Sequence, residues 1–84
     1  MFTIKYFQPA DAGPSQMVIE SADKVEEAVG PTGKKYVRLI RHQTGLLARD
    51  TFETIIIMDE DGKTGPSSVF VENLAGKTVQ RIAF

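Results

Sequence analysis

FETIIIM, residues 52–58, is the strongest strand signal in this sequence because three consecutive isoleucines stand among other strand-forming residues. Two further runs of strand-forming residues follow it, Ser68–Asn73 and Thr78–Phe84. The turns between these runs both contain Gly-Lys-Thr, at 62–64 and 76–78. Their offset of fourteen residues is the length of one strand plus one turn. We therefore expect two successive hairpins, a β-meander, in the last third of the chain.

The residues before this stretch supply three more strand signals. Phe2–Gln8 and Met17–Glu20 read as strands, and proline, glycine and aspartate separate them. We expect these two strands to form a hairpin across a loop of about seven residues. Tyr36–His42 alternates enough to be another strand. The next segment, QTGLLARDT at 43–51, is ambiguous: it is either a wide hairpin loop, or 46–49 extend the sheet.

One short helix is predicted from the residue spacing between the second and third strand signals. Ser21 stands at an N-cap position and Asp23 in the first turn. Val25 and Val29 follow at helical spacing until Gly30 and Pro31 stop the run. A helix of about two turns is marginal alone, so we expect its valines to pack against the sheet.

These elements predict an α+β fold. The sheet is mainly antiparallel with five to six strands, the order is β-β-α-β-β-β-β, and the short helix packs on one face. Curling of the sheet toward a barrel is also compatible with these elements. With 84 residues the chain has room for a single domain, 1–84.

Composition limits the chemistry of the protein. There is no cysteine, so disulfides and thiolate metal sites are excluded. The net charge is -1, so no global field draws the protein onto nucleic acid or anionic lipid. The first residues lack the features of a secretory signal, and no segment approaches the roughly 20 apolar residues of a membrane span. We expect a cytoplasmic protein without a membrane partner.

No catalytic, cofactor or metal site is expected from the motifs. A phosphate-binding loop needs a glycine five residues before each Gly-Lys-Thr, where this chain has Ile57 and Val71. In Asp-Glu-Asp-Gly at 59–62, glycine comes fourth instead of sixth, which does not fit a calcium loop. His42 is the only histidine, so a multi-histidine metal site is excluded. An enzyme subunit is the weakest of the functions considered.

The segment 34–42 is the one local patch that resembles a nucleic-acid surface, because cations and an aromatic ring alternate in it. Strand alternation divides the charges: Arg38 shares a face with Tyr36, and Arg41 shares the other face with Lys35. Cross-strand acids offer partners that would neutralise these cations: Asp50, Glu53 and Asp59. Nucleic-acid binding through this segment, with Lys34 included, is therefore the alternative function.

The predicted sheet is apolar on both faces. Ile55, Ile57 and Val69 alternate with Ile56, Met58 and Phe70 along the strands, so both sets include large apolar side chains. Such a sheet must curl into a barrel, stack on a second layer or bury its spare face against a partner. The partner would be another protein or a second copy of this chain, joined in part through edge strands.

By layout, FTIKYF at 2–7, MVIESADKVEEAV at 17–29 and the meander that follows resemble small phage accessory proteins. These include the anti-CRISPR inhibitors, which work by occupying a surface of a host defence complex. The resemblance covers the strand-strand-helix start, about a third of the chain, and no functional residue carries over by motif. It implies a stoichiometric inhibitor.

We therefore expect a non-enzymatic protein that acts through protein–protein contacts, in which apolar sheet surface supplies affinity and charged loops fix orientation. The candidate partner-binding residues are Lys34, Lys35, Tyr36, Arg38, Arg41, Asp59, Asp61 and Phe70.

Overall fold

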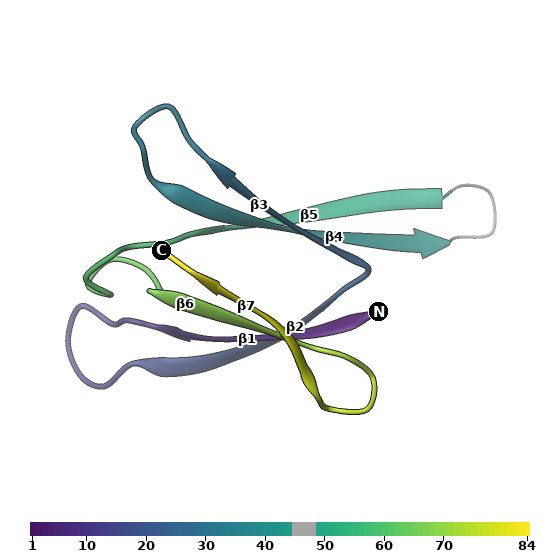
Figure 1. Cartoon of the computed structure of the whole chain (residues 1–84), viewed down its shortest axis with the longest axis horizontal. Helices are drawn as coiled ribbons and strands as arrows, with labels where there is room; N and C mark the ends of the chain where they lie inside the picture. Colours follow the sequence, from purple (N-terminus) through teal and green to yellow (C-terminus); the bar gives the residue numbers. More distant parts are fainter. Residues whose placement is uncertain (45–48) are drawn as a thin grey trace.

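The computed structural model of the protein describes residues 1–44 and 49–84, and within these ranges every regular element is a strand. The seven strands are β1 (Phe2–Gln8), β2 (Gln16–Ala22), β3 (Lys24–Val29), β4 (Lys35–Thr44), β5 (Arg49–Ile57), β6 (Ser68–Glu72) and β7 (Thr78–Ala83). Sheet A has the order β2-β1-β6-β7 and sheet B the order β3-β4-β5, and all pairs are antiparallel. The two sheets form two layers (Figure 1), and the fold is all-β.

The predicted helix is wrong, and with it the α+β class and the count of five to six strands. Strand β3 occupies most of that segment and pairs with β4 from Lys24↔Ile40 to Val29↔Lys35. Asp23 is the corner between β2 and β3: its amide donates to the Ile40 carbonyl at 2.8 Å, and its carboxylate accepts the His42 amide at 2.8 Å. A two-turn helix is marginal alone, whereas this ladder satisfies the same backbone groups against a central strand.

The meander is only half right. Of its two predicted hairpins, β6 and β7 form the second. The separate hairpin predicted at the start of the chain is confirmed, because β1 and β2 pair across residues 9–15. β5 and β6 do not pair, because β5 pairs with β4 in sheet B while β6 pairs with β1 in sheet A. The ambiguous segment extends the sheet at Arg49, which pairs with Thr44, and residues 45–48 lie outside the described residues.

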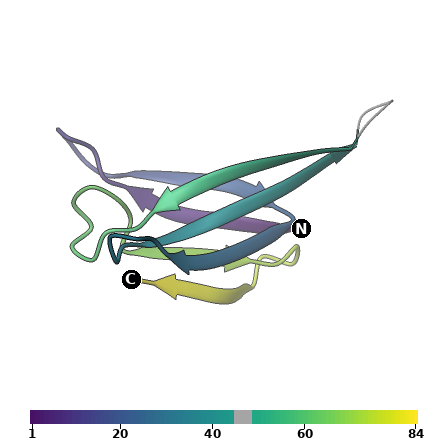
Figure 2. The same ribbon diagram turned by 90° about the horizontal axis from the view of Figure 1, so that it is seen from above.

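The core lies between the two sheets. Sheet A contributes Ile4, Tyr6, Val69, Val71 and Ile82, and sheet B contributes Val37, Leu39 and Ile56; Ala22 and Met58 complete the buried cluster. Burial raises the pKa of Tyr6, and the nearby Glu20 carboxylate adds to this effect. Of the outcomes open to a sheet that is apolar on both faces, the structure shows a second layer; the barrel is not closed, because each sheet keeps two edges. Figure 2 shows the two layers from above, with the β4–β5 hairpin extending beyond sheet A.

The recurring Gly-Lys-Thr motif belongs to two Asx-stabilised turns. In the β6–β7 turn, the Asn73 side chain accepts the amides of Ala75 and Lys77, both at 3.0 Å, and Gly76 has a φ of 80°. In the loop between β5 and β6, the Asp59 carboxylate accepts the amides of Lys63 and Thr64 at 3.0 and 2.9 Å. These turns explain the repeat as turn chemistry.

The hydrogen bonds from Thr64, Lys63 and Asp61 favour the charged carboxylate and lower the pKa of Asp59 to about 2. Because the pKa is depressed in the folded chain, the stability from this charge is present above the ordinary value of 3.8 and is lost as pH falls toward 2. We expect Asp59→Asn, which keeps an acceptor oxygen, to flatten the loss of stability between these pH values. Urea unfolding at several pH values measures this, and equal pH dependence in both proteins would contradict it.

Gly65 packs the same loop against the end of β5. A Cβ atom at this position would lie 2.2 Å from the carbonyl oxygen of Ile57, so only glycine fits without a shift of the backbone. Gly65 and the following Pro66 are both buried. The loop therefore covers the backbone of β5 at Ile57.

Candidate functional site

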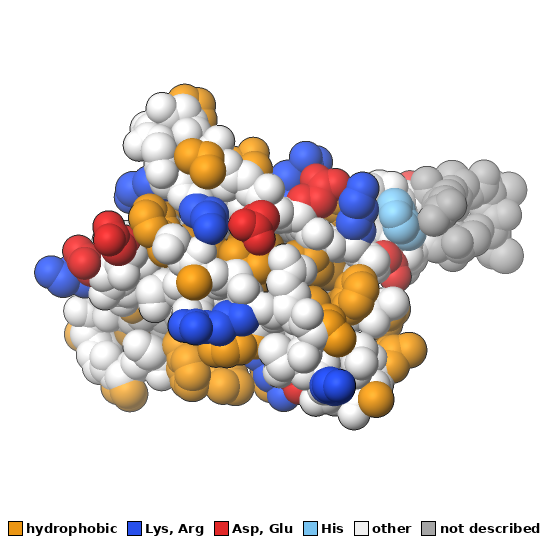
Figure 3. All heavy atoms as spheres, in the orientation of Figure 1, with side chains coloured by type: hydrophobic (Ala, Val, Ile, Leu, Met, Phe, Trp, Pro, Cys, Tyr) orange, Lys and Arg blue, Asp and Glu red, His pale blue; other side chains and the backbone are white. Residues whose placement is uncertain are grey.

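Large apolar side chains are exposed side by side on the outer face of sheet A. Phe7 lies opposite Met17 across the β1–β2 pair, and Lys5 lies between Ile19 on β2 and Phe70 on β6. We call Phe7, Met17, Ile19 and Phe70 the sheet A face; their exposed fractions run from 36% to 60%. An antiparallel sheet that packs on one side usually presents polar side chains on the other. Figure 3 shows hydrophobic side chains gathered along the margin of the molecule formed by sheet A.

Charged side chains border and cross this apolar surface. Lys5 pairs with Glu72 at 2.8 Å, which places a neutral ion pair beside Ile19 and Phe70. The guanidinium carbon of Arg81 lies 5.8 Å from the centre of the Phe70 ring, within the range of a cation–π contact. Arg81 also donates to the Ser68 hydroxyl at 3.1 Å. Apolar side chains thus lie among fixed charges, as in protein interfaces.

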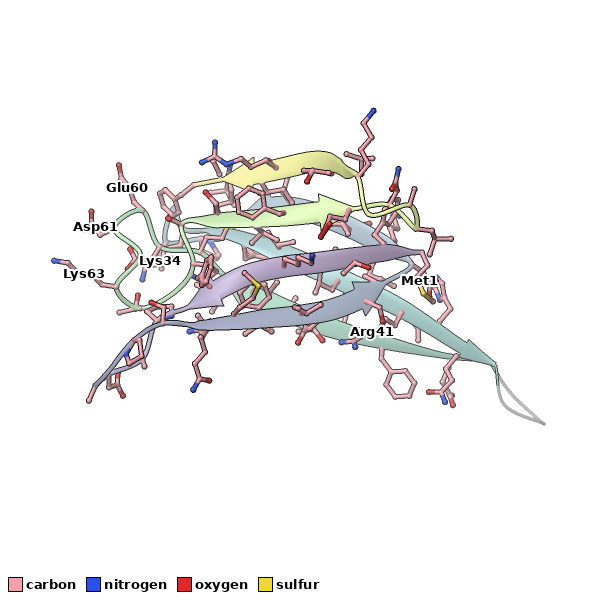
Figure 4. The ribbon with its side chains drawn as sticks, turned by 90° about the horizontal axis from the view of Figure 1, so that it is seen from below. Met1, Lys34, Arg41, Glu60, Asp61 and Lys63 are labelled. Atoms are coloured by element: carbon pink, nitrogen blue, oxygen red, sulfur yellow. The ribbon has the colours of Figure 1, made fainter. Side chains whose placement is uncertain are left out.

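A depression of about 310 Å³ adjoins the sheet A face where the β5–β6 loop meets the sheet. Phe7 and Phe70 form its apolar wall, and Asp61, Ser15 and Ser67 supply polar atoms. Figure 4 shows sheet A from its outer side, with Asp61, Glu60 and Lys63 at the end where this loop lies and Met1 at the other end. The structure therefore brings together two predicted residues, Asp61 and Phe70.

The outer face of sheet B carries a second apolar area. Tyr36, Ile55 and Ile57 border a depression of about 440 Å³, together with Lys34, Arg38 and residues 30–32. Arg38 pairs with Glu26 at 3.5 Å and with Glu53, which confirms Glu53 as its cross-strand partner. Glu26 also pairs with Lys24 at 2.9 Å, and the hydrogen bond and charge of Lys24 lower the pKa of Glu26. Arg38 and Lys24 therefore both have acidic partners on this face.

The basic segment does not form one patch. Lys35 donates to the Ala83 carbonyl at 2.7 Å and lies 3.6 Å from Glu27. Arg41 faces inward and donates to the Thr54 hydroxyl at 2.6 Å. Lys34 and Arg41 lie well apart along the molecule (Figure 4). Asp59 holds the backbone of its own loop instead of an arginine. Phosphate binding by a cluster of these cations therefore has no geometric basis in the described residues.

Sequence reasoning missed three members of the sheet A face: Phe7, Met17 and Ile19. The signal was present, because the alternation in FTIKYFQ places Ile4 and Tyr6 on one face and Lys5 and Phe7 on the other. Without the strand order, however, the neighbours of an outward Phe7 are not defined. The β1–β6 pairing, which joins residues far apart in sequence, supplies Phe70.

Within the described ranges, no group of three or more histidine, aspartate or glutamate side chains is arranged to hold a metal ion. No helix in the described part of the chain is long and apolar enough to cross a membrane. No protein-family model matches the sequence, no curated protein sequence is significantly similar to it, and no solved structure is significantly similar to its fold.

Proposed function

We propose that this protein binds another protein through the sheet A face and acts by occupying its partner, without catalysis. The observation that carries the proposal is the contiguous exposure of Phe7, Met17, Ile19 and Phe70. Contiguous apolar patches on soluble domains mark interaction sites, and aromatic residues and methionine are enriched there.

The chemistry of the partner follows from the surface. The depression of about 310 Å³ has two phenylalanines on one side and serines and Asp61 on the other, so it suits an anchor side chain with an apolar body and a polar end, which would occupy part of it. Asp61 lies at this depression, so a basic residue next to the anchor would find a carboxylate. Arg81 and the Lys5–Glu72 pair would fix the orientation of the complex.

That the protein acts as a stoichiometric inhibitor of a host defence complex stays a prediction. The resemblance to phage inhibitors was based on a strand-strand-helix start, and the third of these elements is strand β3. That layout therefore lends no support to a choice of partner, and the proposed function depends on the sheet A face alone.

Site-specific photocrosslinking tests the proposal while the partner is still unidentified. Benzoylphenylalanine in place of Phe70, introduced in the cells that produce the protein, is expected to give one discrete heavier adduct. The matched control carries the same residue in place of Ile57, which is 61% exposed on the outer face of sheet B. Adducts from Ile57 but none from Phe70 would contradict the assignment to sheet A.

A further inference from the structure

Among residues 1–44 and 49–84, strand β5 has a regular edge that no other strand pairs with. It has nine residues and is the longest edge strand of the described structure, and its pairing with β4 contains no bulge. It also contains no proline and no lysine, two of the residues that natural edge strands use against further pairing.

The direction of the β5 backbone groups follows from one hydrogen bond. The Met58 amide donates to the Lys35 carbonyl at 2.9 Å, in the register that pairs Ile57 with Tyr36. Because antiparallel pairs alternate, even-numbered residues of β5 point their amides and carbonyls at β4. Thr51, Glu53 and Ile55 therefore point theirs at the free edge. Ile57 does so too, but Gly65 covers its carbonyl.

The edge of β7, unlike that of β5, has features that hinder pairing with a further strand. The Phe84 amide donates to the Ser67 carbonyl at 3.1 Å, so the neighbouring Ala83 carbonyl points away from β6. Lys35 donates to this carbonyl at 2.7 Å, and the β6–β7 pairing is irregular between Val71 and Glu72. Such devices discourage strand addition.

We propose that β5 pairs antiparallel with β5 of a second copy of this chain, about a two-fold axis at Phe52. This register uses the free edge from Arg49 to Ile55, and it places Thr51 opposite Glu53 of the partner subunit. Phe52 then lies opposite Phe52 of the partner subunit, and aromatic cross-strand pairs stabilise sheets. Phe52 is 50% exposed in the single chain, so pairing would cover part of this residue.

Other registers are disfavoured by charge or by the covered end of β5. An axis at Glu53 places two like charges directly opposite each other, which is destabilising. An axis at Thr54 or Ile55 requires pairing at Ile57, where Gly65 covers the carbonyl. An axis at Thr51 leaves Ile55 unpaired. The far end of the β4–β5 hairpin extends beyond the backbone of sheet A (Figure 2). The dimer would join two sheet B layers and carry two sheet A faces.

Solution mass tests the dimer. Light scattering on a sizing column is expected to give twice 9.3 kDa for the natural chain and 9.3 kDa for Thr51→Pro. This substitution removes an outward amide and the hydroxyl that contacts the His42 ring, but no backbone hydrogen bond to β4. Val29→Pro, at an outward and exposed position of the β3 edge, is the matched control and is expected to stay dimeric. A natural chain that remains monomeric at about 1 mM, or a Thr51→Pro chain that remains dimeric, would overturn the proposal.

Disulfide trapping tests the register, because the chain contains no cysteine of its own. Phe52 forms a non-hydrogen-bonded pair at the axis, where Cα atoms about 4.5 Å apart permit a disulfide. Phe52→Cys is expected to cross-link on mild oxidation much faster than Thr54→Cys or Val29→Cys. Equal rates at Phe52 and Val29 would show random collision, and faster linkage at Thr54 would show the wrong register; either result overturns this dimer. Both tests are independent of sheet A, so they can fail while the proposed function stands.

Discussion

Replacement of Leu39 by alanine is expected to lower the free energy of unfolding by about 2–5 kcal/mol. Leu39 is fully buried on the central strand of sheet B, in the cluster that also contains Ile4 and Val71 of sheet A. The substitution removes apolar contacts and leaves a cavity between two layers that can relax only in part. A domain of this size has only about 4–13 kcal/mol of stability in total, so the loss is a large fraction of it.

Leu74→Ala is the matched control, because this leucine is 82% exposed in the β6–β7 turn. Its removal is expected to change stability by less than about 0.5 kcal/mol. Urea unfolding followed by circular dichroism measures both variants against the natural chain. Similar losses at Leu39 and Leu74 would show that the core does not lie between these sheets.

Local patterns predicted most of the strands but not their partners. The runs at Phe2–Gln8, Tyr36–His42 and Phe52–Met58 lie in β1, β4 and β5, within a few residues at each end. The helix was wrong because Val25 and Val29 satisfy a period of four, while the same six residues also extend along β4. Whether this segment becomes a helix or a strand depends on whether a neighbouring strand is available to pair with it. That strand is β4, and most residues of β3 pair with β4 residues that lie outside the range of a local sequence pattern.

The sequence also did not predict which strands belong to the same sheet. The pairing of β1 with β6 joins Thr3 to Glu72, and no local signal distinguishes it from the expected pairing of β5 with β6. The same limit applies to the site. Phe70 and Asp61 were predicted from their residue types, and the sheet order then placed Phe7 beside them. Lys35 and Arg38 were predicted to bind a partner, but in the structure both contact groups of their own chain.

The second large effect is expected at the sheet A face. Ile19→Thr together with Phe70→Thr keeps strand-forming residues at two outward positions but removes a large part of the apolar surface. A few central aromatic and aliphatic residues carry most of the free energy of an interface. We therefore expect the double variant to bind the photocrosslinked partner about 100-fold more weakly, which corresponds to about 2.7 kcal/mol.

Ile55→Thr together with Ile57→Thr is the control pair, because Ile57 is as exposed as Ile19 but lies on the outer face of sheet B. Isothermal titration calorimetry of the purified partner with the natural chain and both double variants is the decisive measurement. If the partner binds through the sheet A face, the affinity of the Ile19 and Phe70 variant is expected to fall about 100-fold, and that of the control less than about threefold. Equal affinities for the two variants, or the larger loss in the sheet B variant, would contradict binding through sheet A.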